Sequence, residues 1–181
     1  YNGGTRRGLV RLNPNGTLDS TFDQGVGINS AGWVRTLSIQ TDGRILVGGL
    51  FSSYNGTSRI NLARLNMNGS LDSSFDPGTS TSSVVMSTVL LADGRFLIGG
   101  GITSYNGTPT GNLVRVNSNG SLDLSFAIGT GANAVVNSIG LQPDGRIVIG
   151  GNFTSINGLS RSRIARLFAD GSVDPNFNSS P

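Results

Sequence analysis

The sequence predicts an all-β protein of short antiparallel strands that recur in similar copies. Three observations lead to this fold class. The chain of 181 residues contains 28 glycines and many Asn-Gly and Asp-Gly pairs, which favour tight hairpin turns. Its 13 basic residues are all arginine and its 10 acidic residues are all aspartate, so the strong helix formers lysine and glutamate are absent. Short runs of valine, isoleucine and leucine lie between the turns, and no window has a helical apolar period.

Internal repetition sets the organisation of the chain. The motif Asp-Gly-Arg begins at Asp42, Asp93 and Asp144, at intervals of 51 residues. Four phenylalanines follow the same period after a first interval of 53, at Phe22, Phe75, Phe126 and Phe177. The two additional residues lie before Asp42, where the loop QGVGINSAG is longer than its counterparts. We therefore treat residues 1–181 as a single segment with repeat copies at 1–41 (partial), 42–92, 93–143 and 144–181 (partial).

The first two strands of each copy form a predicted hairpin around Asp-Gly. The first strand is expected at 34–40, 85–91 and 136–142. The second strand follows the turn at 44–49, 95–100 and 146–151, and its near-continuous apolar run predicts burial on both faces. It ends in two glycines, which let neighbouring backbones approach closely.

The third and fourth strands form a second predicted hairpin. The third strand is expected at 9–13, 62–66, 113–117 and 164–168, after a connection that contains Asn-Gly. The fourth carries an apolar residue four positions before each repeated phenylalanine, which puts the pair on one face of a strand. These residues are Leu18, Leu71, Leu122 and Val173.

Four short antiparallel strands in about 51 residues predict one blade of a β-propeller. The period is too long for one coil of a β-helix, and a β-sandwich would not repeat its core residues at a fixed spacing. The chain holds about three and a half such repeats, whereas a closed propeller needs at least about four blades. We therefore expect further repeats in the native polypeptide, before Tyr1, after Pro181 or both.

The repeated pattern resembles a known family. Its letters, DGR-I-L-V-G-G-x-F…N-G…L-A-R-L-N-x-N-G-S-L-D-x-S-F, are similar to the bacterial delta-60 repeat, a β-propeller domain of unknown function, over essentially the whole chain. The likeness to kelch blades is looser. The resemblance implies a propeller in large secreted or surface-attached bacterial proteins, and it implies no catalytic or binding residues.

Composition argues against several classes of function. Without cysteine or histidine, the chain has no disulfide framework, no thiolate or imidazole metal ligand and no serine triad. Each Asn-Gly loop offers too few carboxylates for calcium. We therefore expect no metal, no cofactor and no enzyme activity. The net charge of +3 is small, which argues against nucleic acid, and no apolar run approaches the about 18 residues of a membrane-spanning helix.

Arginines and aspartates recur in every copy. An arginine lies among the apolar residues of each third strand, and a half-buried guanidinium needs a carboxylate partner. Because both residues recur in every copy, we predict structural pairs within the blades. The arginines are Arg11, Arg64, Arg115 and Arg166, and the partners are Asp19, Asp72, Asp123 and Asp174.

Positions that differ between copies are the better candidates for ligand binding. Tyrosine precedes most of the connecting Asn-Gly pairs and arginine follows them, so the two could form a row along one loop face that binds an anionic glycan or an acidic protein surface. The alternative is a solvated loop with tyrosine packed over the next blade. Trp33 is either a packing residue or an exposed contact, and we expect packing. The row comprises Tyr1, Arg6, Tyr54, Arg59, Tyr105, Arg161 and Arg163.

Taken together, the sequence predicts a non-enzymatic scaffold or adhesive protein-interaction module, secreted or on the cell surface of a bacterium. Its expected partners are other propeller repeats of the same polypeptide or neighbouring copies, and a protein or glycan surface. Neither nucleic-acid binding nor membrane insertion is expected. A glycan-binding propeller that uses the Tyr/Arg row is the alternative, and an aspartate-dependent glycoside-acting enzyme is a more distant one.

Overall fold

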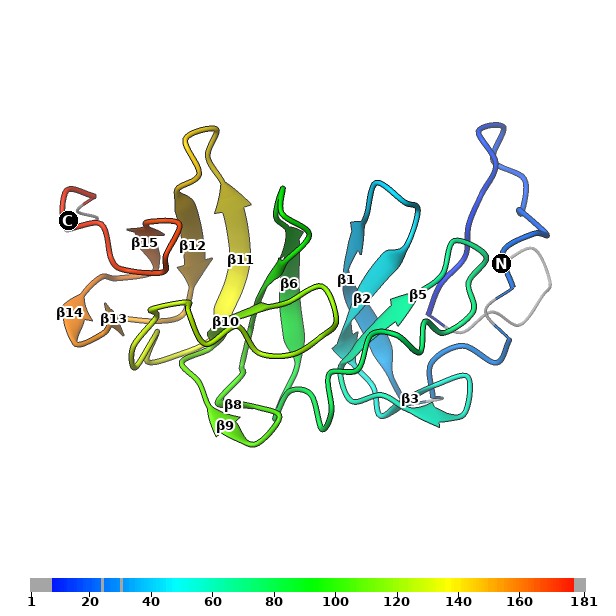
Figure 1. Cartoon of the computed structure of the whole chain (residues 1–181), viewed down its shortest axis with the longest axis horizontal. Helices are drawn as coiled ribbons and strands as arrows, with labels where there is room; N and C mark the ends of the chain where they lie inside the picture. Colours follow the sequence, from blue (N-terminus) through cyan, green and yellow to red (C-terminus); the bar gives the residue numbers. More distant parts are fainter. Residues whose placement is uncertain (1–7, 24, 30, 178–181) are drawn as a thin grey trace.

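The computed structural model describes residues 8–23, 25–29 and 31–177, and this part of the chain contains strands and turns but no helix. Accordingly, it has no helix that could cross a membrane. Three three-stranded antiparallel sheets follow one another along the chain (Figure 1). The sheets are β1 (Trp33–Ile39), β2 (Ile45–Leu50) and β5 (Leu62–Leu65); β6 (Val85–Leu90), β7 (Phe96–Gly100) and β10 (Leu113–Val116); and β11 (Val136–Leu141), β12 (Ile147–Gly151) and β15 (Ile164–Leu167).

Each sheet has the strand order that the repeat predicts. The second strand is central, with the first and third strands antiparallel on its two sides. In the first sheet every residue of β2 except Leu50 is buried, as the apolar run predicts. The first strand of each copy has a register shift, between Val34 and Thr36 in β1. The all-β prediction and the blade-like grouping are confirmed. We call the three sheets, with their loops, the first, second and third complete blades.

The predicted fourth strand is wrong as an extended element. It is reduced to single bridges, of which Leu65↔Leu71 in the first blade is an example. The chain turns away immediately afterwards, because Asp72 Oδ1 accepts a hydrogen bond from the backbone N–H of Ser74 and the Phe75 N–H donates to the Asp72 carbonyl. A side chain that bonds its own backbone two residues on favours a turn over a ladder.

A small hairpin that the sequence did not resolve follows each central strand. It pairs β3 (Ser53–Tyr54) with β4 (Thr57–Ser58), and Asn55 and Gly56 occupy the turn with φ of 48° and 77°. Two residues with positive φ are the signature of a type I′ turn. The equivalents are β8 (Ser104–Tyr105) with β9 (Thr108–Pro109) and β13 (Ser155–Ile156) with β14 (Leu159–Ser160). These hairpins define the lower face of the molecule, and the Asp-Gly turns define the upper face (Figure 1).

The double glycines permit two close approaches, the first glycine against the neighbouring blade and the second against the first strand of its own sheet. A Cβ on Gly48 would lie 2.5 Å from Val85 Cγ1 of the second blade, and one on Gly49 would lie 2.2 Å from the Trp33 carbonyl oxygen. Close packing therefore requires glycine at both positions. Between β1 and β6, Ser38 Oγ donates to the Thr88 carbonyl, 2.9 Å away, across the interface of the first and second blades.

Candidate functional site

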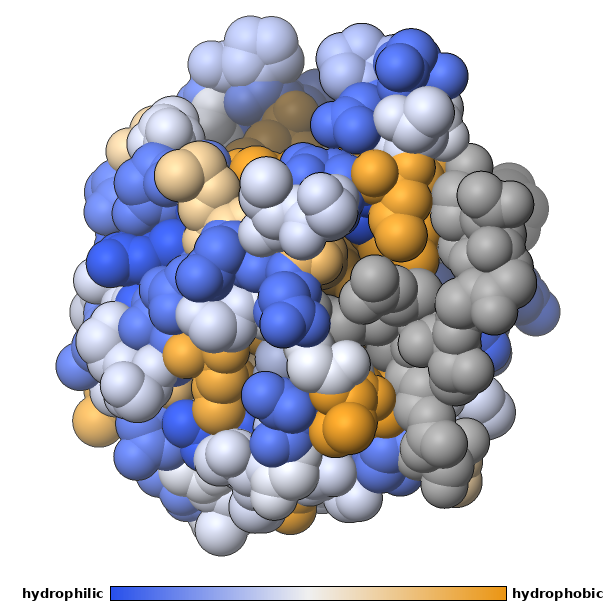
Figure 2. Space-filling view, turned by 90° about the vertical axis from the view of Figure 1, so that its right-hand side faces the viewer, coloured by the Kyte–Doolittle hydropathy of each residue, from blue (hydrophilic) through white to orange (hydrophobic). Residues whose placement is uncertain are grey.

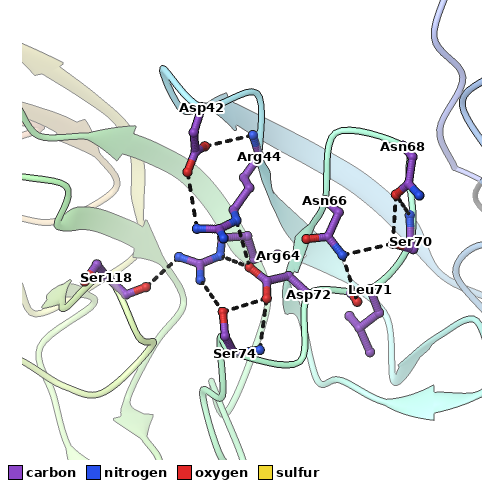
Figure 3. A network of polar contacts seen from close by, with 10 residues as sticks. All are labelled: Asp42, Arg44, Arg64, Asn66, Asn68, Ser70, Leu71, Asp72, Ser74 and Ser118. Atoms are coloured by element: carbon purple, nitrogen blue, oxygen red, sulfur yellow. Dashed lines mark hydrogen bonds and ion pairs between the residues drawn. The ribbon is translucent and has the colours of Figure 1, made fainter.

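A polar cluster is built around the arginine of each third strand. Arg64 on β5 donates from Nε to Asp72 Oδ2 at 2.7 Å and from Nη2 to Ser74 Oγ at 3.1 Å (Figure 3). Its guanidinium carbon lies 4.9 Å from the centre of the Phe75 ring, within cation–π distance. The arginine side chain is 4% exposed and the aspartate side chain 7% exposed. Arg64, Asp72 and Phe75 thus form one buried unit, which we call the Arg–Asp–Phe cluster.

The Arg–Asp–Phe cluster recurs in every copy. The predicted pairs are all present, with Nε–Oδ2 distances of 2.8 Å for Arg11–Asp19, 2.7 Å for Arg115–Asp123 and 2.9 Å for Arg166–Asp174. A phenylalanine ring lies under each of these guanidiniums. The rings belong to Phe22, Phe126 and Phe177.

The clusters also link one blade to the next, which the sequence did not predict. Arg64 donates from Nη1 to the Ser118 carbonyl of the second blade at 2.5 Å (Figure 3). Arg115 donates in the same way to the Ala169 carbonyl of the third blade at 2.8 Å, and Arg11 donates to the Met67 carbonyl. The guanidinium is therefore both a partner of its own aspartate and a connection across the blade interface.

A second arginine approaches each of the three later aspartates from the Asp-Gly-Arg turn. Arg95 Nη1 lies 2.5 Å from Asp123 Oδ2 and its Nη2 lies 2.6 Å from Asp93 Oδ2. The Nε atoms of Arg44 and Arg146 lie 3.4 Å from Asp72 and Asp174 respectively. The repeated motif thus supplies an additional positive charge to the buried carboxylate of its own blade.

Electrostatics keep these carboxylates ionised. Burial alone would raise the pKa of Asp72, but hydrogen bonds from Ser74 and Arg64 outweigh it and lower the pKa below its usual value. For Asp123 burial is opposed by hydrogen bonds from Ser125, Arg115 and Arg95, and the pKa is likewise well below its usual range. A carboxylate with a lowered pKa and no free oxygen is suited to structure rather than to proton transfer.

The other carboxylates hold turns. Asp23 and Asp76 accept hydrogen bonds from the N–H groups of Gly25 and Gly78, and Asp170 accepts from Ser172. The aspartates of the Asp-Gly-Arg motifs bond the backbone N–H two residues later. Within the described residues no three acidic groups are close enough to hold a metal ion.

The described tyrosines of the proposed row do not lie on the loop face and are packed instead, as the alternative interpretation expected. Tyr54 and Tyr105 are fully buried, and their hydroxyls donate to the carbonyls of Gly69 and Gly120 at 2.7 Å and 2.5 Å. Burial raises the pKa of both tyrosines. The physical reason is that each ring lies in a hydrophobic core shared with the preceding copy, Tyr54 with Phe22 and Ile28, and Tyr105 with Leu46 and Phe75. Tyr1 and Arg6 lie outside the described residues.

The arginines of the proposed row do not form a shared site. Arg59 and Arg161 are half-buried and donate from Nη1 to the carbonyls of the preceding residues, Ser58 at 2.9 Å and Ser160 at 2.8 Å. Arg163 is exposed and lies in the left-handed region with φ of 65°. With the tyrosines buried, the expected aromatic and cationic row is absent from the described part of the lower face.

Two cavities of about 420 Å³ open on the upper face, between the Asp-Gly turns. They share Leu91, Ala92 and Leu141. Two arginines line one of them. Arg95 is already bound to Asp93 and Asp123, and Arg115 to Asp123 and the Ala169 carbonyl, so both have little capacity left for a ligand.

Sequence reasoning missed a cleft of about 370 Å³ on the lower face of the first blade. It lies between Asn29, Ala31 and Gly32 on one side and the end of β2 and the segment before β5 on the other, and its walls include Leu50, Phe51 and Ile60. Trp33 pairs directly with Leu50 in the β1–β2 ladder and is 46% exposed, so the expectation that it packs in the core is wrong. At the positions of Trp33, Leu50 and Ile60 the other copies carry smaller or polar residues, and this difference is the sequence signal for an unusual surface here.

Each repeat consists of three strands and a bridge in place of a fourth strand, and neighbouring repeats pack closely at the double glycines. These features define the chain as a set of β-propeller blades. It belongs to the family described as "Domain of unknown function (DUF5122) beta-propeller", whose model matches residues 1–22, 40–75, 91–126 and 142–177. Each matched segment ends at the phenylalanine of an Arg–Asp–Phe cluster. The resemblance to a bacterial propeller repeat of unknown function is thus confirmed.

Other comparisons add little to this assignment. A crystal structure of a protein of unknown function from Bacteroides caccae is similar, with a TM-score of 0.42 and 14% identity. The similarity covers 80% of this chain and 66% of that one, so this chain spans just under two thirds of the other protein's length. No curated protein matches the chain.

Proposed function

We propose that the chain is a non-enzymatic interaction module, a scaffold or adhesive element of a larger bacterial protein that is secreted or held at the cell surface. One observation carries the proposal: all ten carboxylates of the chain accept hydrogen bonds within the architecture. Aspartate is the only acidic residue type in the chain, so general acid–base chemistry would depend on these groups.

The repeated clusters support a scaffold role in a second way. Each arginine of the interior clusters bonds its own blade and the next one, so the blades form a continuous, rigid support. A rigid repeat support with loops that differ between copies is typical of repeat proteins that bind partners. The expected partners are further repeats of the same polypeptide, neighbouring copies and protein surfaces. The extracellular location rests on the family resemblance.

The absence of catalysis is tested by incubating the purified chain with a panel of polysaccharides and polypeptides. We expect saturable binding to some of these and no release of reducing ends or new amino termini. Product release that scales with chain concentration and falls in Asp93→Asn, a substitution in an exposed turn, would overturn the proposal.

Location is tested separately, in cells that make the complete natural polypeptide. We expect protease added to intact bacteria to cut it, with a cytoplasmic marker protein intact in the same sample. Cleavage seen only after lysis would contradict an extracellular module.

A further inference from the structure

We propose that the cleft on the lower face of the first blade binds an extended peptide segment that presents a large apolar side chain beside a carboxylate. This inference rests on the proposed function, because it names the partner class of a non-catalytic interaction module. Four features carry it: a copy-specific apolar surface, a cleft beside it, an arginine without a carboxylate partner, and polar groups free to bond a peptide.

The apolar surface is specific to the first blade. Trp33 is 46% exposed, and Leu50 and Ile60 are each 37% exposed. Small or polar residues occupy the equivalent positions of the second and third blades, so the repeat architecture does not require these side chains. In chain order the equivalents are Val84 and Val135 for Trp33, Gly101 and Asn152 for Leu50, and Gly111 and Ser162 for Ile60.

The three apolar residues converge at one place although they are separated in the sequence. Leu50 and Ile60 both line the 370 Å³ cleft. Trp33 lies opposite Leu50 in the antiparallel ladder, so the two side chains stand on the same face of the sheet, within contact distance of each other. Tryptophan is enriched among the few residues that contribute most to binding at protein interfaces. Figure 2 views the molecule from the N-terminal side, on which apolar residues are exposed.

The charge beside the cleft is positive. The guanidinium carbon of Arg35 lies 5.4 Å from the centre of the Trp33 ring. Among the described residues Arg35 has no carboxylate partner, whereas Arg64, Arg95 and Arg115 are each held by one or more aspartates. The other two copies place Met86 and Asn137 at this position. Arg35 can therefore pair bidentately with a carboxylate of the partner.

Polar groups at the cleft suit a peptide backbone. Asn29 Oδ1 accepts from the N–H groups of Ser52 and Ser53, at 2.8 Å and 3.4 Å, and its amide nitrogen has no partner in the described part of the chain. The hydroxyl of Ser52 is likewise without a partner there. These two groups can bond a peptide carbonyl and N–H. By contrast, Asn61 is fully used by Phe51, Thr81 and Ser83.

A peptide fits this cleft better than a glycan does. Each sugar ring carries several hydroxyls that need hydrogen-bond partners, and a buried polar group left without a partner costs free energy. The cleft walls are largely apolar, and among the described side chains that line it, those of Asn29 and Ser52 offer polar groups without a partner. An apolar side chain against Leu50, Ile60 and Trp33 buries carbon surface without that cost.

The test uses fluorescein-labelled octapeptides of glycine and serine that contain leucine or phenylalanine two residues before an aspartate. A matched set carries asparagine in place of the aspartate, and uronic-acid oligosaccharides serve as acidic glycan probes. Binding to the complete chain is followed by fluorescence polarisation for the peptides and by the emission of Trp33, the only tryptophan, for all probes. We expect saturable binding of the aspartate set and weaker binding of the asparagine set.

Variants that copy the third blade locate the site. Trp33→Val, Leu50→Asn and Ile60→Ser introduce residues that the same fold already holds at Val135, Asn152 and Ser162. We expect Trp33→Val to weaken binding about 10-fold or more, as for a hot-spot residue. Arg35→Asn should remove the preference for aspartate over asparagine, a change that a purely structural role would not produce. Leu124→Ser in the second blade is the control, because Leu124 is exposed and Ser73 is its equivalent.

Each outcome decides the inference. No saturable binding by any peptide overturns it, as does binding of uronic-acid oligosaccharides in place of peptides. Peptide binding that survives Trp33→Val, Leu50→Asn and Ile60→Ser overturns the site but leaves the interaction module intact. Cleavage of a bound probe by the chain would instead overturn the proposed function. Circular dichroism melting of each variant separates loss of binding from loss of fold.

Discussion

Two copies of the same Arg–Asp–Phe cluster differ in their surroundings. Arg64 and Arg166 both bond an aspartate eight residues later and stack over a phenylalanine. The Arg64 side chain is 4% exposed, whereas that of Arg166 is 23% exposed. Arg64 also donates to Ser118 of the next blade, and Arg166 has no such acceptor in the described part of the chain. Arg11 donates to Met67 of the next blade and is still 33% exposed, so a bond to the next blade does not by itself bury the guanidinium. The pair is therefore built within a blade, and its burial depends on the packing around that blade.

The glycines show the same contrast. A Cβ on Gly48 would lie 2.5 Å from Val85 of the next blade, whereas one on Gly150 would meet only the Arg163 carbonyl oxygen, at 3.8 Å. Both glycines belong to the double glycine of a central strand. The requirement for the first glycine of the pair thus comes from the blade interface, whereas the second glycine is required within its own sheet, where a Cβ on Gly151 would lie 2.1 Å from the Val135 carbonyl oxygen.

Acid should produce the largest effect, because it acts on all clusters together. The pKa values of Asp72, Asp123 and Asp174 are lowered in the folded chain below the unfolded value of about 3.9. Their contribution is therefore complete above about pH 4 and is lost as the pH falls through the lowered folded values. Urea unfolding at a series of pH values should show stability falling only below about pH 4. A flat profile in this range would mean that the pairs contribute little.

Arg64→Ala should be the most damaging single substitution in the comparison. It leaves Asp72 buried and removes a bond to the next blade, so a loss of about 3–5 kcal/mol is expected. Arg166→Ala should cost clearly less, because the more exposed Arg166 has no bond to a following blade. Chemical unfolding of the two variants measures the difference. Equal losses would show that the contact between blades is unimportant.

Gly48→Ala should destabilise the chain by about 1–3 kcal/mol, because the added methyl group is forced against Val85 and Thr36. Gly150→Ala is the matched control, and we expect it to be neutral or to stabilise by up to about 1 kcal/mol through the unfolded state. Thermal unfolding of both variants provides the test. Destabilisation by Gly150→Ala of the same size would place the requirement in the strand and not in the interface.

Tyr54→Phe should have the smallest effect, about 0.5–1.5 kcal/mol, because it removes one hydrogen bond to the Gly69 carbonyl and keeps the ring. Tyr105→Phe should match it, since Tyr105 bonds Gly120 in the same way. The third copy already holds Ile156 at this position, buried and without a hydroxyl. A loss well above this range would indicate that the hydroxyl organises more than one turn.

Local patterns explain most of what the sequence predicted correctly. The central strand, its Asp-Gly turn and the Arg64–Asp72 pair all depend on residues within about ten positions of each other, where spacing alone restricts geometry. The prediction of an extended fourth strand was wrong for a local reason that the composition does not show. Asp72 bonds the backbone of Ser74 and so ends the strand where alternation alone would continue it.

The candidate site was predicted less well. Tyr54 and Trp33 are both aromatic residues at variable positions, yet the first is fully buried and the second is 46% exposed. Nothing in their spacing separates the two cases. The outcome depends on the tertiary surroundings: Tyr54 lies in a core cluster with Phe22 and Ile28, whereas Trp33 pairs with Leu50 beside the lower cleft.

By itself the sequence determined the period, the blade architecture and the arginine–aspartate pairs, because each of these depends on short spacings and turn chemistry repeated in every copy. Only the tertiary structure decided which arginines are fully buried, which glycines are obligatory and where the lower cleft lies. Those properties depend on residues roughly 40 to 55 positions apart that meet across a blade interface, on backbones that approach within a sheet, or on side chains from separate loops that lie side by side. Spacing within a repeat carries no information about such contacts.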